Sequence, residues 1–321
     1  GVFYARRSLR IFPAYYLVLS ASLFLIAPLD IPVFRFLYLT DAWRTVAEAA
    51  WCNYLYVVNY VRPGNTPSPI SWAWSLSVEE HFYAFLPPLL YLVYRIRRPG
   101  VRPVVIALVG GAPLVGRALQ HLADPSIELM KGFYYYSHNR FDEVFVGVMI
   151  AYYYVTKREA FRAFAERHRH VLWVAGIACV GTVWVFGGLQ KSDGFAVVAQ
   201  FSLMALGAGL LVINCLFLDN TVSRFFAHPL WYPLARISYG TYLIHPFVLF
   251  AFLALYLRDA PLTALQPWDV IGFFFLVLVA TTLLAGLMFV LLEAPLLRVG
   301  MRMSARRPAR AGAWGARPAQ G

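Results

Sequence analysis

The 321-residue chain is 60% hydrophobic and only 14% charged, with a mean hydropathy of +0.60. Soluble domains carry about 25% charged residues, so this balance excludes an ordinary soluble protein and predicts one that crosses a membrane several times. The net charge of +12 does not indicate a nucleic-acid-binding protein, because the basic residues form short clusters beside apolar runs, as at the cytoplasmic ends of membrane helices.

Eight apolar segments have about the length, near 20 residues, that a helix needs to cross a bilayer. They are residues 12–29, 72–94, 103–122, 140–156, 171–188, 195–217, 236–256 and 270–292. Pro13 stands where the first span could begin, since proline suits the first turn of a helix. The sequence therefore predicts an all-α fold, a polytopic bundle of membrane helices with about eight spans.

Basic clusters predict the topology of these spans. Four clusters should face the cytoplasm, at residues 6–10, 95–102, 157–169 and 298–310. The segment 45–61 is apolar at one end but carries three polar side chains, and a crossing there would place residues 95–102 outside. We therefore expect it to be re-entrant or interfacial, within an outer loop from about 30 to 71.

One membrane domain should occupy residues 1–300. The basic loop 157–169 is predicted to form an amphipathic cytoplasmic helix. Residues 301–321 are rich in Arg, Ala, Gly and Pro, and we expect a basic disordered cytoplasmic tail there. We expect a multi-pass protein of the inner (plasma) membrane. Both ends of the chain should lie in the cytoplasm.

Three arginines near the start form the first candidate binding site. Arg6, Arg7 and Arg10 have helical spacings of three and four residues, so Arg10 shares a face with both others. Guanidinium groups suit phosphates, and coenzyme A presents several phosphates on the cytoplasmic side of a membrane. The alternative is a topological anchor that meets lipid phosphates.

The stretch "SWAWSLSVEEHFYAFLP" places carboxylates at the start of an apolar segment. Ser75, Glu79 and Tyr83 would lie on one stripe of a helix, and carboxylates within a membrane usually mark a functional site. Glu79 could orient a hydroxyl group or accept its proton. The alternative is structural: Ser77 would cap the helix and Glu80 would complete a capping box, which leaves Glu79 unexplained.

Other polar residues within apolar runs have a structural interpretation beside the functional one. Arg140 opens the span 140–156 on the outer side, where it could form a local ion pair with Glu143. His245 is expected to bond to a neighbouring helix, and Glu293 to pair with a basic residue. No cluster of His, Asp or Glu has the spacing of metal ligands, so no metal is predicted.

Five segments, taken in order, are similar to the acyltransferase type 3 family of integral membrane O-acyltransferases. They are "FYARRSLRIFPAYY", "WSLSVEEHFYAFLP", "RFDEVFVGVMIA", "ISYGTYLIHPF" and "LLEAPLLR", which together run across residues 3–298. The resemblance implies a ten-helix fold with both ends cytoplasmic. It also implies transfer of an acyl group, often acetyl, from cytoplasmic acyl-CoA to a hydroxyl on the far side, commonly on a carbohydrate.

The resemblance also assigns residues. The family's Arg-x-x-Arg motif matches Arg7 and Arg10, and its Trp-Ser-Leu-Ser-x-Glu motif matches residues 74–79. The histidine expected to be catalytic lies in the family's first helix, and neither His81 nor His245 matches it. The similarity begins after the family's second helix, so we expect this chain to lack the first two helices and that histidine.

The resulting hypothesis is a bacterial-type membrane O-acyltransferase. Acyl-CoA, with acetyl-CoA expected, would be the co-substrate, bound through Arg6, Arg7 and Arg10, and a carbohydrate or glycolipid would be the acceptor. Glu79, Ser75 and Arg140 would form the catalytic acceptor side. A glycolipid transporter or flippase and a non-catalytic remnant are the alternatives; the acceptor, the acyl group and the oligomeric state stay open.

Overall fold

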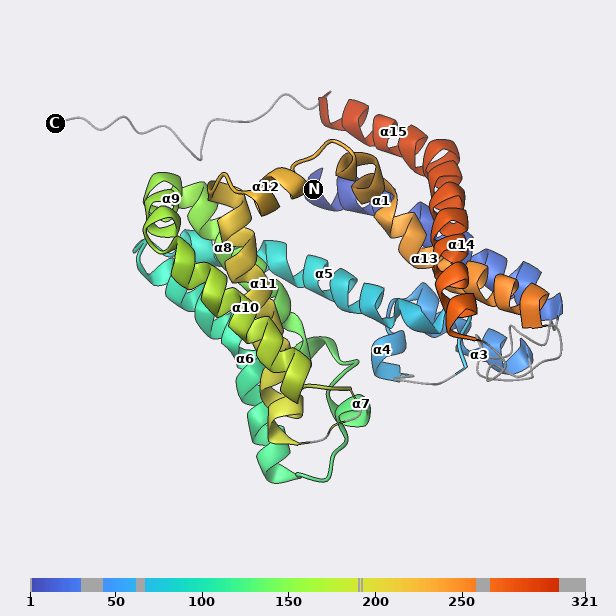
Figure 1. Ribbon diagram of the computed structural model, residues 1–321, viewed down its shortest axis with the longest axis horizontal. Helices are drawn as coiled ribbons and strands as arrows, with labels where there is room; N and C mark the ends of the chain where they lie inside the picture. Colours follow the sequence, from blue (N-terminus) through green and yellow to red (C-terminus); the bar gives the residue numbers. More distant parts are fainter. Residues whose placement is uncertain are drawn as a thin grey trace. The chain divides into compact units, whose positions relative to one another are not determined.

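The structure, a computed structural model, describes residues 2–29, 43–61, 67–189, 191, 193–257 and 266–305 (Figure 1). All regular secondary structure in these residues is helical, which confirms the predicted all-α class. The longer helices are α1 (Val2–Ala21), α3 (Trp43–Tyr54), α5 (Trp74–Arg95), α6 (Val101–Ala123), α8 (Phe141–Thr156), α9 (Arg158–Arg167), α10 (Arg169–Phe186), α11 (Gln200–Phe217), α13 (Trp231–Leu257), α14 (Pro267–Met288) and α15 (Ala294–Ala305).

Short helical segments connect or extend these helices. Three are short α-helices, α4 (Val58–Val61), α7 (Leu129–Gly132) and α12 (Thr221–Phe226). Three are 3₁₀ turns, η2 (Ala27–Leu29), η3 (Ser71–Ala73) and η4 (Ser137–Asn139), and three are π-helical, η1 (Ser22–Ile26), η5 (Phe195–Ala199) and η7 (Phe289–Glu293).

Six stretches of the described chain are helical, long and apolar enough to cross a membrane. They are Phe3–Leu29, Val101–Ala123, Arg169–Phe186, Phe195–Phe217, Trp231–Tyr256 and Pro267–Gly300. The other two predicted spans also form helices, but α5 carries Glu79 and Glu80 near its start, and α8 has only 16 residues. The polytopic helical architecture is therefore confirmed, and the crossing of the membrane by α5 and α8 stays a prediction.

Helix α1 begins earlier than the sequence suggested. Pro13 lies inside this helix, which starts at Val2, so the arginine cluster belongs to the same helix as the apolar segment that follows. The residues of α1 that are buried recur at helical spacing on one face: Ile11, Ala14, Tyr15, Val18 and Leu19. Packing of this continuous face outweighs the hydrogen bond that proline cannot donate.

The chain divides into two compact units, which are described separately. The first comprises residues 1–37 and 232–321, and the second residues 38–231. In the first unit, α1 packs against both η7 and α15. Helix α15 continues to Ala305, so the boundary suggested at residue 300 falls within it, and the remainder of the predicted tail, 306–321, lies outside the described residues.

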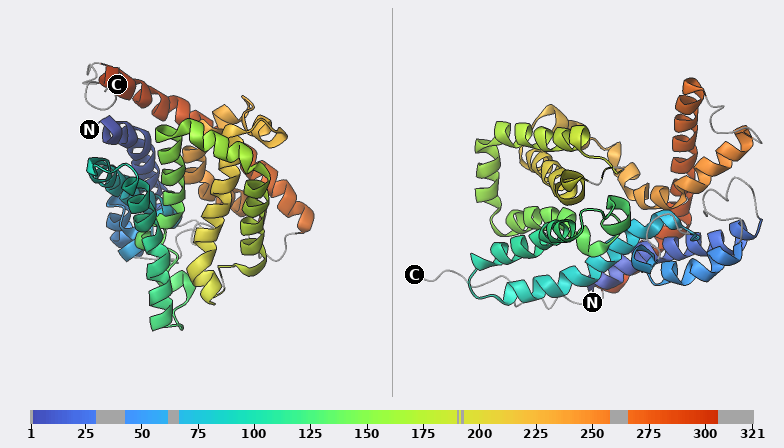
Figure 2. Two further views of the ribbon diagram at one scale, coloured as in Figure 1. Left: turned by 90° about the vertical axis from the view of Figure 1, so that its left-hand side faces the viewer. Right: turned by 90° about the horizontal axis from the view of Figure 1, so that it is seen from below.

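In the second unit, α8 packs against α6 and α11, and α10 runs alongside α11 in all views (Figures 1 and 2). Glycines permit the close approach of α10 and α11. A Cβ atom on Gly207 would lie 2.8 Å from the Cβ of Cys179 and 3.0 Å from the carbonyl oxygen of Gly176. Small residues at such a crossing let two membrane helices pack backbone to backbone.

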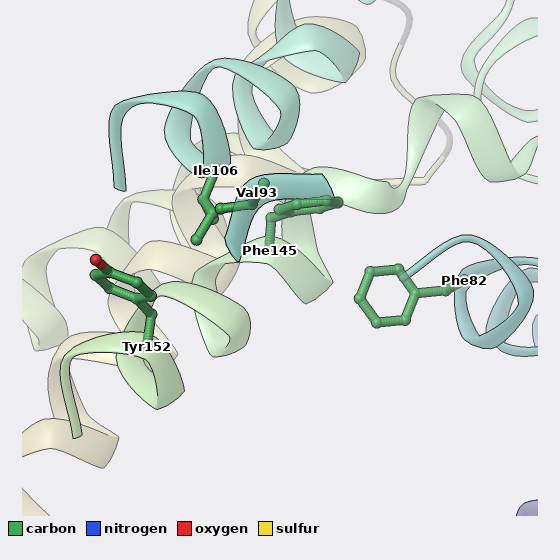
Figure 3. Packing of buried hydrophobic residues seen from close by; sticks show 5 residues of the cluster. All are labelled: Phe82, Val93, Ile106, Phe145 and Tyr152. Carbon is green, nitrogen blue, oxygen red and sulfur yellow. The ribbon is translucent and has the colours of Figure 1, made fainter. Parts of the chain in front are cut away.

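A buried cluster ties α5 to this bundle. Phe82 and Val93 from α5, Ile106 from α6, and Phe145 and Tyr152 from α8 form its centre (Figure 3). The rings of Phe82 and Phe145 meet edge to face with centroids 5.8 Å apart. Aromatic pairs of this kind contribute beyond the burial of their area, and here they hold the middle of α5 next to the first turns of α8.

The predicted amphipathic helix of the loop 157–169 is present as α9. Its apolar residues Phe161 and Ala165 are buried against Leu172 of α10 and Ile213 of α11. The opposite face is charged and exposed, with Arg162 donating to Glu166 at 2.8 Å. This division of faces agrees with a helix that lies along the end of the bundle.

The segment 45–61 does not form a single spanning helix, in agreement with the sequence. Helices α3 and α4 are separated by a turn in which Tyr56 has a φ of 56°. Asn53 and Asn59 are fully buried and bonded to protein: Ser68 donates to Asn53 at 2.6 Å, and Asn59 donates to Ser137 at 2.8 Å. The position of this segment in the membrane stays a prediction.

Candidate functional site

Helix α5 begins before the residue that was predicted as a possible cap. The 3₁₀ turn η3 already winds the chain, so α5 starts at Trp74 with Ala73 at the N-cap. Ser77 is fully buried inside the helix, and its Oγ makes no hydrogen bond to any described residue. The capping-box interpretation of Ser77 and Glu80 is therefore wrong.

The stripe of Ser75, Glu79 and Tyr83 is present on α5. The hydroxyl of Tyr83 donates to Glu79 Oε2 at 2.9 Å, one helical turn away. Ser75 and Tyr83 are partly buried, whereas Glu79 is exposed. An accessible carboxylate held by a phenol hydroxyl has a defined direction and can still meet a hydroxyl-bearing ligand.

A buried polar cluster lies next to this stripe. His81 Nδ1 is 2.7 Å from the hydroxyl of Ser137, which accepts a bond from Asn59 at 2.8 Å. Asn59 also donates to the carbonyl oxygen of Tyr135 at 3.2 Å. The cluster joins α4, α5 and the segment before α8, so it positions the start of α5 relative to Arg140.

Contacts between aromatic rings also join α4 and α5 to the segment before α8. Tyr60 meets His138 through its hydroxyl, 3.0 Å from Nδ1, and the two rings stack with centroids 5.8 Å apart. Burial lowers the pKa of His138, which lies in the turn η4, so its imidazole favours the neutral form. Trp74 packs against the rings of Tyr134 and Tyr135, with centroids 4.9 and 5.0 Å apart.

Arg140 forms the local ion pair that was the structural alternative. Its Nε lies 2.6 Å from Glu143 Oε1, and both side chains are largely buried, at 16% and 28% exposure. The guanidinium also lies over two rings, 4.1 Å from the centroid of Phe201 and 5.0 Å from that of Tyr134. Through Tyr134, the arginine is connected by ring contacts to Trp74 at the start of α5.

A second arginine was not singled out from the sequence. Arg117 of α6 is completely buried, and it donates to both carboxylate oxygens of Asp142, at 3.1 and 2.7 Å. It also donates to the carbonyl oxygens of Val198 and Asn139 and to the hydroxyl of Ser202. A lone arginine in an otherwise apolar segment was the available signal, since such a charge needs a partner in the bundle.

A pocket of about 360 Å³ opens beside Arg140. Its walls come from the end of α10, the loop after it, the start of α11 and Tyr134. Gln200 lines the pocket and is 3% exposed. Two nitrogens of the lining, Arg140 Nη1 and Gln200 Nε2, are buried and have no acceptor among the described residues.

The arginine cluster belongs to the first unit. Arg6, Arg7 and Arg10 all lie on α1; Arg7 is half-buried on the side of Ile11, and Arg6 and Arg10 are exposed. Buried Glu293, at the end of η7, lies close enough to Arg10 for an electrostatic interaction, and its expected pairing with a basic residue stays a prediction.

His245 was expected to form a hydrogen bond to a neighbouring helix, but its Nδ1 bonds within its own helix. This nitrogen donates to the carbonyl oxygen of Tyr242 in the same helix, at 2.8 Å. The side chain lines an apolar cavity of about 500 Å³ between α13 and α14, together with Thr241 and Thr281. Across the described part of the chain, no group of three His, Cys, Asp or Glu side chains is arranged to hold a metal ion.

Comparison with known proteins decides the family. Residues 1–290 match the family described as an acyltransferase domain. The chain belongs to this family. The match runs across both compact units, so the arginine cluster and the α5 stripe are parts of one acyltransferase domain.

Curated relatives of this acyltransferase are distant but extensive. Nodulation protein 10 of Rhizobium leguminosarum bv. viciae is 25% identical over 95% of this chain and 77% of the relative. A putative peptidoglycan O-acetyltransferase of Bacillus subtilis, YrhL, is 24% identical over 95% of this chain and 47% of its own length. Nose resistant to fluoxetine protein 6 of Caenorhabditis elegans is 22% identical, and the match covers 33% of it. No solved structure matches.

The predicted site residues of the acyltransferase fall into two sets. Arg6, Arg7 and Arg10 share a helix in the first unit, whereas the residues predicted for the acceptor side, Ser75, Glu79 and Arg140, belong to the second. Within the second unit, Trp74 and Tyr134 connect the start of α5 to Arg140. Gln200, like Arg117, was missed, although it is one of only two amides in the apolar run 195–217.

Proposed function

We propose that this membrane acyltransferase moves an acyl group from cytoplasmic acyl-CoA to a hydroxyl group of an extracytoplasmic carbohydrate or glycolipid. Acetyl is the expected acyl group, and the bacterial inner membrane is the expected location, with both chain ends in the cytoplasm. The match of residues 1–290 to the acyltransferase domain carries this proposal. The similarity to a putative peptidoglycan O-acetyltransferase supports an acceptor hydroxyl.

The reaction is an exchange of a thioester for an ester. The acceptor oxygen attacks the acyl carbon, a C–O bond forms, the C–S bond breaks, and the hydroxyl proton ends on the coenzyme A thiolate. Glu79 would orient the acceptor hydroxyl or take its proton for transfer. Its exposure and its bond from Tyr83 support this role, because the carboxylate is both accessible and held in direction. Ser75 would donate to the acceptor from the same stripe of α5.

The arginines of α1 would bind the donor. Arg6 and Arg10 are exposed one turn apart on the same helix, so their guanidinium groups can meet phosphates without unfolding this helix, and the half-buried Arg7 lies next to them. Hydrogen bonds between guanidinium and phosphate are charge-assisted and stronger than neutral ones. In the predicted topology this cluster faces the cytoplasm, where acyl-CoA is found.

Acyl transfer in membranes tests the proposal. Vesicles that contain the full-length protein receive acetyl-CoA labelled in the acetyl group, and label is measured in the carbohydrate and glycolipid fractions. The protein should transfer label, and Glu79→Gln should lower turnover per folded molecule by about 100-fold, because glutamine keeps the shape but loses the basicity.

Glu128→Gln is the matched control, since Glu128 is an exposed carboxylate that pairs with Lys131 on the surface. It should retain full turnover. Movement of an unmodified glycolipid across the membrane, with no label transferred, would favour the transporter and reject the acyltransferase. Full specific activity of Glu79→Gln would remove Glu79 from the mechanism.

A further inference from the structure

The pocket beside Arg140 has a chemistry that the proposed transfer does not use. It lies entirely in the second unit, where the end of α10 meets the start of α11. Val183, Phe201 and Met204 provide apolar walls, and Trp184, which is 86% exposed, stands at its edge. A concave, mainly apolar site with a few convergent polar groups is typical of a ligand-binding pocket.

The orientation of the Gln200 amide follows from its neighbour. The backbone N–H of Gly188 donates to Gln200 Oε1 at 2.9 Å. Because a backbone N–H requires an acceptor, the oxygen must face Gly188, and the NH₂ group is left with no acceptor in the described chain. The π-helical segment η5 directly precedes Gln200 and brings it to this position at the first turn of α11.

A glycine in the loop after α10 leaves space for the side chain of Gln200. A Cβ atom on Gly187 would lie 2.8 Å from Gln200 Oε1 and 3.1 Å from Cγ1 of Val183. Any larger residue would therefore push the glutamine away from its bond to Gly188. Gly187 and the bond from Gly188 together hold a buried amide whose donor side remains unused.

Arg140 supplies the second unused donor, but its charge is already balanced. Glu143 binds the Nε edge at 2.6 Å, and Nη1 is the nitrogen without an acceptor. A buried donor that lacks an acceptor costs free energy of desolvation. A ligand oxygen that accepted bonds from Arg140 Nη1 and Gln200 Nε2 would remove this cost for both nitrogens. A ligand carrying a full negative charge would meet repulsion from Glu143, so a neutral oxygen fits better.

We infer that this pocket binds a neutral acylamino group of the acceptor. Its carbonyl oxygen accepts hydrogen bonds from Gln200 Nε2 and Arg140 Nη1, and its methyl group packs against Phe201 and Met204. This inference rests on the proposed function, since it names the acceptor of that reaction as an N-acylated sugar. In the predicted topology the pocket is on the outer side, together with the start of α5.

Direct binding to the detergent-purified protein tests the inference without any acyl transfer. Three probes are compared by saturation-transfer difference NMR titration: the methyl glycosides of N-acetylglucosamine, of glucose and of glucuronic acid. The acetamido sugar should bind best, with the strongest saturation at its acetyl methyl group. Equal binding of the acetamido sugar and the glucoside, preference for the glucuronide, or no binding of any probe would each overturn the inference.

Gln200→Glu is the decisive variant. It keeps the side-chain shape and the acceptor for Gly188 but replaces the unused donor by an acceptor, so binding of the acetamido sugar should weaken by about tenfold or more. Gln266→Glu makes the same chemical change at an exposed glutamine, the N-cap of α14, and should bind as the unmodified protein does. Unchanged binding in Gln200→Glu would overturn the inference.

A second variant guards against misfolding of the first. Trp184→Ala alters the exposed edge of the pocket and should fold normally, as judged by size exclusion, while it weakens binding of the acetamido sugar. If Gln200→Glu does not fold, this variant decides, and unchanged binding would then overturn the inference. The protein could also bind the acetamido sugar in a Gln200-dependent way and yet transfer no acyl group. That result would reject the proposed acyltransferase activity and support the inferred binding pocket.

Discussion

Replacing Arg117 by methionine should destabilise the second unit severely. The arginine is completely buried and connects α6 to Asp142 of α8, to Val198 of η5 and to Ser202 at the start of α11. Methionine fills a similar volume but donates no hydrogen bond. It would leave the carboxylate of Asp142, which is 6% exposed, without its cationic partner.

The magnitude follows from the cost of an unpaired buried charge. Removing one partner of a buried ion pair typically costs about 3–5 kcal/mol, because the other charge stays desolvated without compensation. For a protein of this size that loss lowers the midpoint of thermal unfolding on the order of 10 °C. Replacing both partners by apolar residues should be far less costly, so Arg117→Met with Asp142→Leu should recover most of the loss.

Thermal stability of the detergent-purified protein is the assay, measured as the fraction that remains monodisperse in size exclusion after heating. Arg162→Met is the matched control, because Arg162 pairs with Glu166 on the exposed face of α9 and should be nearly silent. A midpoint for Arg117→Met equal to that of the control would refute the reasoning. So would a double variant that is as unstable as the sum of both single variants.

Three further predictions concern the donor site, the helix packing and the topology. Arg10→Ala should raise the KM for acyl-CoA by about tenfold or more through loss of a charge-assisted bond, and unchanged kinetics would reduce the cluster to an anchor. Gly207→Val should cost about 1–3 kcal/mol of stability in the same heating assay, whereas Gly147→Val, whose Cβ would meet nothing within 4 Å, should be tolerated. In a background without other cysteines, Arg98→Cys should react with an impermeant maleimide only from the cytoplasmic side and Ser126→Cys only from outside; labelling of position 98 from outside would contradict the predicted topology.

Membrane class, helical content and family could be predicted from the sequence because each depends on local or linear features. Apolar length predicts helices in a bilayer, since a backbone in lipid must satisfy its own hydrogen bonds. The stripe of Ser75, Glu79 and Tyr83 follows from the helical period alone, and the structure adds the bond from Tyr83 to Glu79. Five motifs in order were enough to indicate the acyltransferase family, which the match over residues 1–290 confirms.

Local signals were less reliable at the ends of helices. Pro13 and Ser77 each resemble a helix start, yet both lie inside helices that begin earlier. A proline or serine is tolerated in these positions when the face of the helix around it is buried, as it is near Ile11 and Leu76. Burial depends on which other helices pack there, and propensity within one segment carries no such information.

Only the tertiary structure determined the partners of the buried polar residues. Arg117 meets Asp142 and Ser202 across separations of 25 and 85 residues, and Ser137 joins Asn59 to His81. A charge in an apolar run needs a partner, but many partners would satisfy that need equally. The choice is made where α6, α8 and α11 pack, because a hydrogen bond forms only at contact distance, and contact between distant segments is a property of the folded chain.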